Sequence, residues 1–390
     1  MLLSSRQNLN ANEQNNYIRL INNVDNWDEY VKYVIAHQAG PLMYKKVKSL
    51  SLTHKIPKTA MAMLHQSWLK TLGRSMVLIE HFRNTMDAFN KAGLTAIAMK
   101  GIYLSDWLYS EVGLRQFSDI DLLLKPKEAL EALEILKNLG YSSSTIYMAN
   151  FYKKHNNKNE FVHYPPMTLN GVSIEIHTRL YSNNADFNVE IDDLFDNALM
   201  SKVQGVKSFI FSPEDMLINL CLHMEKHFRG GAFQLTGFYD ISNILDIFNE
   251  IIDADKLMKI CKKYSVEKYV YKYFHLCNIY FLTTLPSISG IENYLPDNKD
   301  HLLFNKRLQM DRSYVNFFDT YGKNVQSFNK LSDKFRYILH FIIPSPEYLT
   351  NRYRLKSKIL LPLYYFYRIY LALKISFNAL QGSIHYKLKK

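Results

Sequence analysis

Two aspartates separated by one residue are the feature of this sequence with the clearest chemical potential. Asp119 and Asp121 lie in the run Phe117–Leu124 (FSDIDLLL), whose apolar residues predict a strand. Because alternate residues of a strand share a face, both carboxylates point the same way, and Ile120, Leu122 and Leu124 point the other way. Neighbouring carboxylates repel each other, and a divalent cation that prefers hard oxygen ligands, such as Mg²⁺, relieves that repulsion. The pair therefore indicates a metal site.

A third acid lies in a second predicted strand. In Val172–Thr178 (VSIEIHT), valine and isoleucines alternate with Ser173, Glu175 and His177, so these three side chains share the other face. If this strand lies beside the one that carries Asp119, Glu175 completes a cluster of three carboxylates. Such a cluster can hold two metal ions about 3.5–4 Å apart for in-line phosphoryl displacement.

Positive charge and a glycine precede the acids. Lys100-Gly101 follows the apolar run 94–99, where a buried strand is predicted to give way to a helix. Glycine permits close backbone approach, and the unpaired N–H groups at the start of a helix attract phosphate oxygens. Lys100 could add a point charge for a triphosphate, and Arg115 a planar fork of donors.

The elements that must position these residues change character along the chain. Apolar residues recur at helical spacing over 27–37 and 59–92, whereas short apolar runs and one amphipathic helix follow. Asn170-Gly171, between two strand-like runs, predicts a hairpin. From residue 212 onward, helices return.

The sequence thus predicts an α+β protein with a small mixed β-sheet. The predicted domains are an N-terminal helical cap over residues 1–93, the α/β core over 94–211, and a C-terminal helical domain over 212–390 with a basic tail.

The order of these motifs resembles the minimal core of the DNA polymerase beta superfamily of nucleotidyltransferases: a glycine-containing turn, a DxD strand and a later acid. More narrowly, the chain resembles the bacterial uncharacterised nucleotidyltransferase family. The resemblance rests on Met99–Gly101, Arg115, Ser118–Leu123, Ile174–His177, His223 and Tyr239–Ile241.

This resemblance implies roles for the residues. Asp119 and Asp121 would be ligands of both Mg²⁺ ions, with Mn²⁺ as an alternative, and Glu175 would be the third ligand, nearest the acceptor hydroxyl. The residues expected to bind nucleotide are Lys100, Gly101, Arg115 and Ser118, and those expected to contact substrate are His177 and His223.

One departure concerns the turn. The superfamily usually has Gly-Ser or Gly-Gly there, whereas this chain has Lys100-Gly101-Ile102. The triphosphate contacts would then come from backbone amides, Lys100 or Arg115.

The expected activity is transfer of a nucleoside monophosphate from an NTP to a hydroxyl, with release of pyrophosphate. The sequence leaves the acceptor open between a small molecule, a protein side chain and an RNA end. The alternative is a binding or scaffold protein of the same fold whose chemistry has lapsed.

Charge is concentrated at one end. The formal net charge is +12, and the nine Lys and Arg residues of 351–390 account for nine of these charges because that segment has no acid. Within it, the apolar run 359–375 is interrupted by Pro362, Arg368 and Lys374, so no transmembrane helix is expected. Three interpretations of the segment stay open: it lies along an anionic surface, it packs on the helical domain, or its interleaved Tyr and Arg residues bind RNA.

Three cysteines form no CxxC pair. An odd, sparse set argues against a secreted disulfide scaffold and favours the cytoplasm.

Overall fold

The computed structural model describes residues 1–143, 162–181, 187, 189–230 and 235–309, together with single positions between 331 and 355 and the stretch 357–370. It forms two compact units. The first comprises Met1–Ser142, Phe161–Glu225 and Gln234–Asp297, and the second comprises Ser143–Glu160, Lys226–Phe233 and Asn298–Lys390. All residues of the candidate site belong to the first unit.

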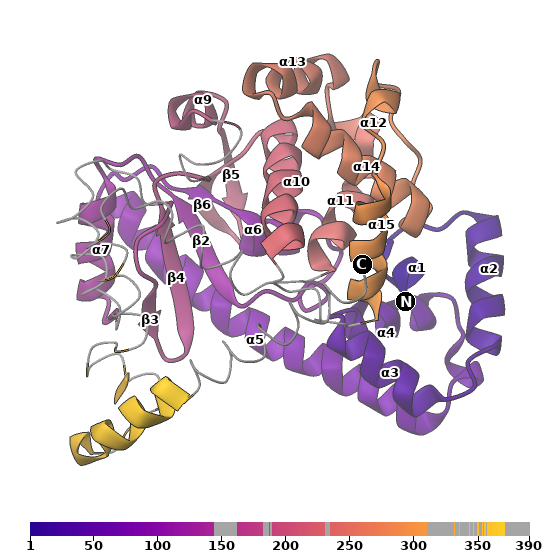
Figure 1. Cartoon of the computed structure of the whole chain (residues 1–390), viewed down its shortest axis with the longest axis horizontal. Helices are drawn as coiled ribbons and strands as arrows, with labels where there is room; N and C mark the ends of the chain where they lie inside the picture. Colours follow the sequence, from indigo (N-terminus) through magenta and orange to yellow (C-terminus); the bar gives the residue numbers. More distant parts are fainter. Residues whose placement is uncertain are drawn as a thin grey trace. The chain divides into compact units, whose positions relative to one another are not determined.

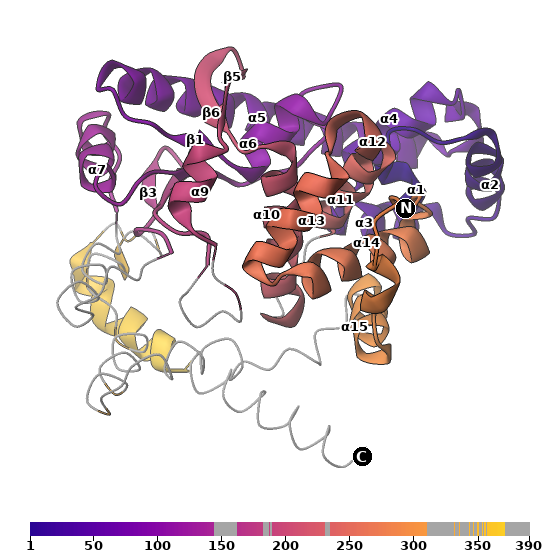
Figure 2. The same ribbon diagram turned by 90° about the horizontal axis from the view of Figure 1, so that it is seen from above.

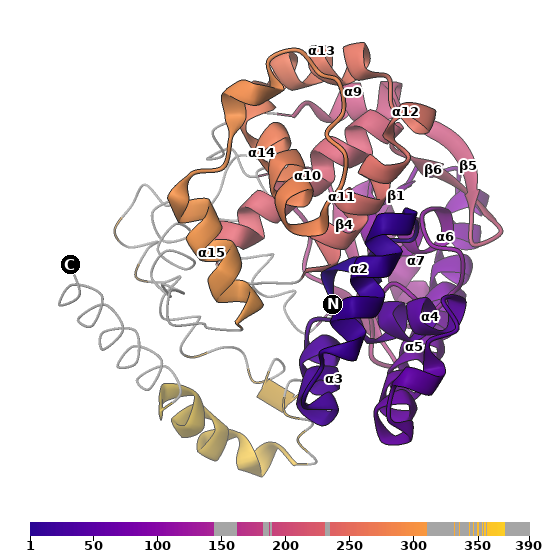
Figure 3. The same ribbon diagram turned by 90° about the vertical axis from the view of Figure 1, so that its right-hand side faces the viewer.

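Helices come first along the chain, as the spacing of apolar residues predicts (Figure 1). They are α1 (Leu2–Ser5), α2 (Ala11–Asn22), α3 (Trp27–Ala36), α4 (Gly40–Ser49) and α5 (Lys58–Lys91), with the 3₁₀ turn η1 (Thr53–Lys55) before α5. Helix α3 begins where Asn26 accepts a hydrogen bond from the Glu29 amide, and α5 continues unbroken past Gly73. Seen from the side in Figure 3, α2 to α5 form one group.

A six-stranded mixed sheet follows, in the order β3-β4-β2-β1-β6-β5. Its strands are β1 (Ile97–Ala98), β2 (Asp119–Leu123), β3 (Met167–Leu169), β4 (Val172–His177), β5 (Leu199–Val203) and β6 (Val206–Ile210). The pairs β4–β2 and β1–β6 are parallel, and the other three pairs are antiparallel. The predicted α+β class with a mixed sheet is confirmed.

Helix α5 passes along the sheet and contacts β2, β4 and β6, and α7 (Ala129–Asn138) contacts β4 (Figures 1 and 2). The side chains of Ile120, Leu122 and Ile174 are fully buried. Helix α6 (Lys100–Trp107) connects β1 to the loop before β2 and contacts β2 and β5. This apolar packing holds β2 and β4, the two strands that carry the acids.

Two tight turns shape the sheet. The predicted hairpin at Asn170-Gly171 is confirmed, with positive φ angles of 50° and 77° at the two turn residues. A second hairpin, β5–β6, turns at Gln204-Gly205 with φ angles of 50° and 84°. Positive φ at both central residues is typical of a type I′ turn, which suits the twist of the two strands.

Helices return after the sheet and group together in Figures 1 and 2. They are α10 (Pro213–Gly230), α11 (Thr236–Asp246), α12 (Phe248–Ile251), α13 (Ala254–Tyr264) and α14 (Glu267–Phe281), followed by the 3₁₀ turn η2 (Ile291–Tyr294). The short helix α9 (Ile191–Asp196) comes earlier in the chain, between β4 and β5. Ser212 caps α10 by accepting from the Asp215 amide at 3.2 Å. Asp253, in a second DxD (Asp253-Ala-Asp255), caps α13 by accepting from the Lys256 amide at 3.0 Å.

The second unit contains α15 (Asn298–Leu308) and the 3₁₀ turn η3 (Lys358–Leu360). Much of the basic tail predicted over 351–390 falls outside the described residues. Within the described part of the chain, no helix is both long enough and apolar enough to span a membrane. The domain boundaries predicted after residues 93 and 211 stay predictions.

Candidate active site

The alignment of β2 with β4 brings two predicted acids face to face. In this parallel pair, Asp121 lies opposite Glu175, and Leu123 lies opposite His177. Asp119, two residues before Asp121, lies opposite Ser173. Because side chains alternate along a strand, Asp119 and Asp121 share one face of β2. The register therefore brings Asp121 beside Glu175, with Asp119 two residues away on the same face of β2.

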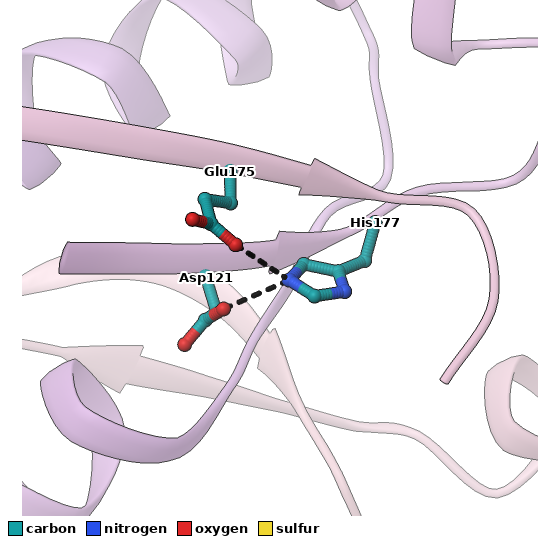
Figure 4. A group of neighbouring side chains, drawn as sticks. All are labelled: Asp121, Glu175 and His177. Atoms are coloured by element: carbon teal, nitrogen blue, oxygen red, sulfur yellow. Dashed lines mark hydrogen bonds and ion pairs between the residues drawn. The ribbon is translucent and has the colours of Figure 1, made fainter. Parts of the chain in front are cut away.

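Asp121, Glu175 and His177 form a compact group of potential metal ligands (Figure 4). One ligand atom from each residue lies within 4.8 Å of the others. The His177 Nε2 atom is 2.8 Å from the Asp121 Oδ1 atom, to which it donates a hydrogen bond, and 3.7 Å from the Glu175 Oε2 atom. The imidazole thus lies between the two carboxylates.

A second histidine flanks Glu175. The His163 Nδ1 atom is 3.9 Å from the Glu175 Oε2 atom, and the His163 and His177 ring centroids are 5.1 Å apart. An isolated β-bridge between these histidines holds the two segments side by side. Sequence reasoning missed His163, because nothing in its surroundings along the chain indicates that it pairs with β4.

The Lys100-Gly101 turn lies against the same acids. The Met99 amide donates to the Asp121 carbonyl at 3.1 Å, which fixes the start of α6 beside β2. The Lys100 Nζ atom is 3.2 Å from the Asp121 Oδ1 atom. Lys100 itself has a φ of 45°, in the left-handed region that a residue with a side chain rarely adopts. Backbone strain of this kind persists where surrounding contacts impose it, often at functional sites.

Gly101 is required by close approach. A Cβ atom at this position would come within 2.6 Å of the Phe117 Cβ atom and 3.1 Å of the Arg115 Nη1 atom. No side chain fits between α6 and the segment that leads into β2. The predicted turn is therefore present, and its glycine has a steric reason.

The acids of the cluster differ in their electrostatics. Burial, reinforced by the negative charges of Asp121 and Glu175, raises the pKa of Asp119 to about 6. Burial also acts to raise the pKa of Asp121, but the Lys100 ammonium and the hydrogen bond from His177 outweigh it and hold that pKa well below its usual value. Asp121 is thus a permanent anion, whereas Asp119 titrates near neutrality.

Glu175 and His177 favour their charged forms. Burial acts to raise the pKa of Glu175, but the interaction with His177 and the charge of His163 hold it below the ordinary value. For His177, burial acts to lower the pKa, and hydrogen bonding to Asp121 and Glu175 raises it overall. Lys100 and protonated His177 therefore balance much of the negative charge of the cluster.

The other predicted nucleotide-binding residues lie around this cluster in different ways. Arg115 is buried, and its guanidinium pairs with Asp240 of α11, with Nη2 2.7 Å from Oδ2. Ser118 is exposed at the start of β2, and its carbonyl accepts a hydrogen bond from Arg74 at 3.0 Å. His223 of α10 is close enough for its charge to lower the pKa of Asp121.

The donor set fits a divalent cation. Asp121 and Glu175 supply hard carboxylate oxygens, and Asp119 lies within electrostatic reach of both. The imidazole of His177 adds a nitrogen donor, which Mn²⁺ and zinc accept more readily than Mg²⁺ does. Asp119, Asp121 and Glu175 remain the predicted metal ligands. His177 joins Asp121 and Glu175 as a further potential ligand.

Comparison with known proteins identifies the family of this chain. Among solved structures, the solution structure of the antibiotic-resistance factor ANT(2'')-Ia is similar at 10% identity, covering 48% of this chain and 91% of that chain with a TM-score of 0.34. No curated protein matches the chain. Residues 23–282, well over half of the 390, match the family described as uncharacterised nucleotidyltransferase. The chain is therefore a member of the uncharacterised nucleotidyltransferase family.

Proposed function

We propose that the protein transfers a nucleoside monophosphate from an NTP to a hydroxyl group of an acceptor and releases pyrophosphate. Family membership supports nucleotidyl transfer in general. The observation that carries the specific proposal is the convergence of Asp121 and Glu175 across β2 and β4, with Asp119 on the same strand and Lys100 beside them.

The roles follow from chemistry and position. A divalent cation bound by Asp119, Asp121 and Glu175 would neutralise charge on the phosphoryl oxygens and favour the ionised acceptor hydroxyl. Lys100, 3.2 Å from Asp121, provides a point charge at the start of α6 for the triphosphate. The backbone N–H groups of the first turn of α6, which no side chain caps, would bind phosphate oxygens.

Glu175 is our assignment for orienting the acceptor hydroxyl. Its pKa is held below the ordinary value, chiefly by His177 working against burial, so its carboxylate is ionised at neutral pH and accepts a hydrogen bond. His177 and His223 are our assignments for contacts with substrate. The acceptor is a small molecule, a protein side chain or an RNA end.

A lapsed enzyme is the second candidate, and one observation favours it. Lys100 and His177 already pair with Asp121 at 3.2 Å and 2.8 Å, so two side chains provide positive charge where a cation would bind. A scaffold needs no metal, whereas the enzyme requires a cation that competes with these side chains.

Nucleotide binding and pyrophosphate release separate the two candidates. We expect one of the four NTPs, with Mg²⁺ or Mn²⁺, to raise the melting temperature, because a ligand that binds only the folded state stabilises it. We also expect pyrophosphate release when a small-molecule, protein or RNA fraction is added as the source of the acceptor. Asp121→Asn should abolish release, and Asp255→Asn, in the other DxD and exposed on α13, should leave it unchanged. Equal release by the parent protein and Asp121→Asn would contradict the proposal.

We also propose that the reaction takes place in the cytoplasm. Cys221, Cys261 and Cys277 are all buried and unpaired. A reducing compartment keeps such thiols in this form, which supports the proposal.

A further inference from the structure

A buried ion pair joins α11 to the loop between α6 and β2. Asp240 is fully buried. The Arg115 guanidinium donates hydrogen bonds to its carboxylate, from Nε to Oδ1 at 2.9 Å and from Nη2 to Oδ2 at 2.7 Å. The Tyr109 hydroxyl donates to Oδ1 of the same carboxylate at 2.7 Å. Burial, together with the adjacent Asp240 charge, raises the pKa of Tyr109 far above its ordinary value, so this phenol stays a donor.

Stability alone does not account for such a pair. Removing two charges from water is costly, and well-packed apolar side chains often replace a buried ion pair at no loss of stability. We therefore look for an explanation of the Arg115–Asp240 pair in what the rest of the guanidinium contacts.

The third nitrogen of the Arg115 guanidinium, Nη1, donates to the Gln116 carbonyl at 3.4 Å and faces the start of α6. This nitrogen lies 3.1 Å from the position that a Cβ of Gly101 would occupy, beside Phe117. The charge of Asp119 also acts on Arg115. Arg115 is thus held by a buried carboxylate on α11 and stays within electrostatic reach of Asp119 on β2.

We propose that Asp240 is a positioning residue for nucleotidyl transfer, which holds the Arg115 guanidinium against Gly101 and keeps it from pairing with the metal-binding carboxylates of β2. This inference rests on the proposed function. It explains why Arg115, predicted to bind nucleotide directly, pairs with Asp240 of α11. Without Asp240, the cationic side chain would turn to Asp119 and compete with the divalent cation.

The consequence is measurable without turnover. Calorimetric titration with Mn²⁺ alone should show binding at least tenfold weaker in Asp240→Asn than in the parent, which corresponds to about 1.4 kcal/mol. Combining Asp240→Asn with Arg115→Gln removes the competing charge and should restore Mn²⁺ binding to within about threefold of the parent.

The same helix offers a matched control. Asp246 of α11 pairs with Arg6 in the same two-pronged way, at 3.0 Å and 2.7 Å, and both side chains are at most 8% exposed. Asp246→Asn likewise removes a carboxylate from a buried arginine, but Arg6 keeps its ion pair with Glu13, so this variant should lose less stability than Asp240→Asn. Its affinity for Mn²⁺ should nevertheless match that of the parent.

The outcomes separate this inference from the proposed function. A parent protein that binds no Mn²⁺ contradicts the metal site and this inference with it. Mn²⁺ binding that is equal in the parent and Asp240→Asn, or equally weakened in Asp240→Asn and Asp246→Asn, overturns the inference alone. If Asp240→Asn does not fold, Arg115→Lys, which keeps the charge but loses the fork, should weaken Mn²⁺ binding in the same direction. Parent-like binding by Arg115→Lys then overturns it.

Discussion

At the scale of single residues, the candidate site is a set of acids in unequal electrostatic positions. Asp121 has Lys100 and His177 within hydrogen-bonding distance, so it stays ionised although it is buried. Asp119 is partly buried and experiences the negative charges of Asp121 and Glu175. It is the acid of the cluster whose ionisation costs most, and a cation has most to contribute there.

This inequality predicts an effect of pH on Asp119→Asn. The folded-state pKa of Asp119 is about 6, above its value of 3.8 in the unfolded chain. Between these pH values the folded protein binds more protons, so the contribution of Asp119 to stability falls as pH rises. Asp119→Asn should therefore increase the free energy of unfolding by about 1–3 kcal/mol at pH 8 in EDTA, with little gain at pH 4.

Urea unfolding at the two pH values checks this prediction. Asp255→Asn is the control, because Asp255 is exposed in the first turn of α13 and should not gain stability on substitution. A gain for Asp119→Asn that is equal at pH 4 and pH 8 would show that charge repulsion is not its cause.

At the scale of elements, the start of α6 is the most tightly constrained part of the site. The Met99 amide ties it to β2, and Phe117 and Arg115 fill the space next to Gly101. Arg74 of α5 donates to the carbonyls of Ser118 and Gly171 at 3.0 Å and 2.9 Å, which anchors the beginnings of β2 and β4 to the long helix. The acids are thus set by packing as well as by strand pairing.

Gly101→Ala tests this packing. The added methyl group would overlap the Phe117 Cβ atom, for which the available separation is 2.6 Å. Overpacking of this kind costs about 1–3 kcal/mol of stability. We also expect the KM for NTP to rise at least tenfold, because the turn must move away from β2.

Gly73→Ala provides the opposite control. A Cβ at Gly73 has no neighbour within 4 Å, and the residue lies inside the continuous helix α5. Alanine there should stabilise the protein by about 0.5–1 kcal/mol, since glycine is the poorer helix former. Thermal unfolding and NTP titration of both variants give the comparison. If the two changes affected stability and KM alike, the steric explanation for Gly101 would be wrong.

The elements show what local sequence patterns can predict. The Asn170-Gly171 hairpin and the shared face of Asp119 and Asp121 follow from turn chemistry and strand alternation, and the structure has both. The β5–β6 hairpin was not predicted, because Gln204-Gly205 is a weaker turn signal than Asn-Gly. The segment Val206–Ile210 (VKSFI) does not alternate between apolar and polar residues, and its position next to β1 depends on tertiary pairing.

Local sequence patterns likewise predict some features of the candidate site and not others. The three carboxylates and the Lys100-Gly101 turn were identifiable from types and spacing. The partners that set their charges were not, since Arg115 meets Asp240 across 125 residues and His163 reaches β4 through an isolated bridge. A contact between distant segments leaves no periodic pattern in the sequence. Nothing in the sequence therefore indicated that Arg115, predicted to bind nucleotide directly, pairs with Asp240.

At the scale of the whole molecule, the helical half contributes to the site that the sheet builds. Asp240 of α11 holds Arg115, and the charge of His223 on α10 acts on Asp121. The family match over residues 23–282 likewise includes both the sheet and these helices. We therefore expect catalysis to need both the sheet and helices α10 and α11.

Charge is the second property at this scale, and it predicts an association. The nine Lys and Arg residues of 351–390, without a single acid, should bind vesicles that contain anionic lipid at low salt. Flotation with anionic vesicles should recover the protein in the lipid fraction, and recovery should fall as salt screens the charge. Replacing Lys387, Lys389 and Lys390 by Gln should weaken recovery. Complete recovery in the soluble fraction at low salt would refute surface attachment.

The central claim, transfer of a nucleoside monophosphate, is tested most directly by the fate of two labels. NTP labelled at the α-phosphate or at the γ-phosphate is incubated with the protein, Mg²⁺ or Mn²⁺, and small-molecule, protein and RNA fractions as acceptor sources. We predict that the α label becomes covalently attached to one fraction while the γ label leaves as pyrophosphate, and that Asp121→Asn loses both events. Transfer of the γ label, or α-label transfer that survives in Asp121→Asn, would contradict the account.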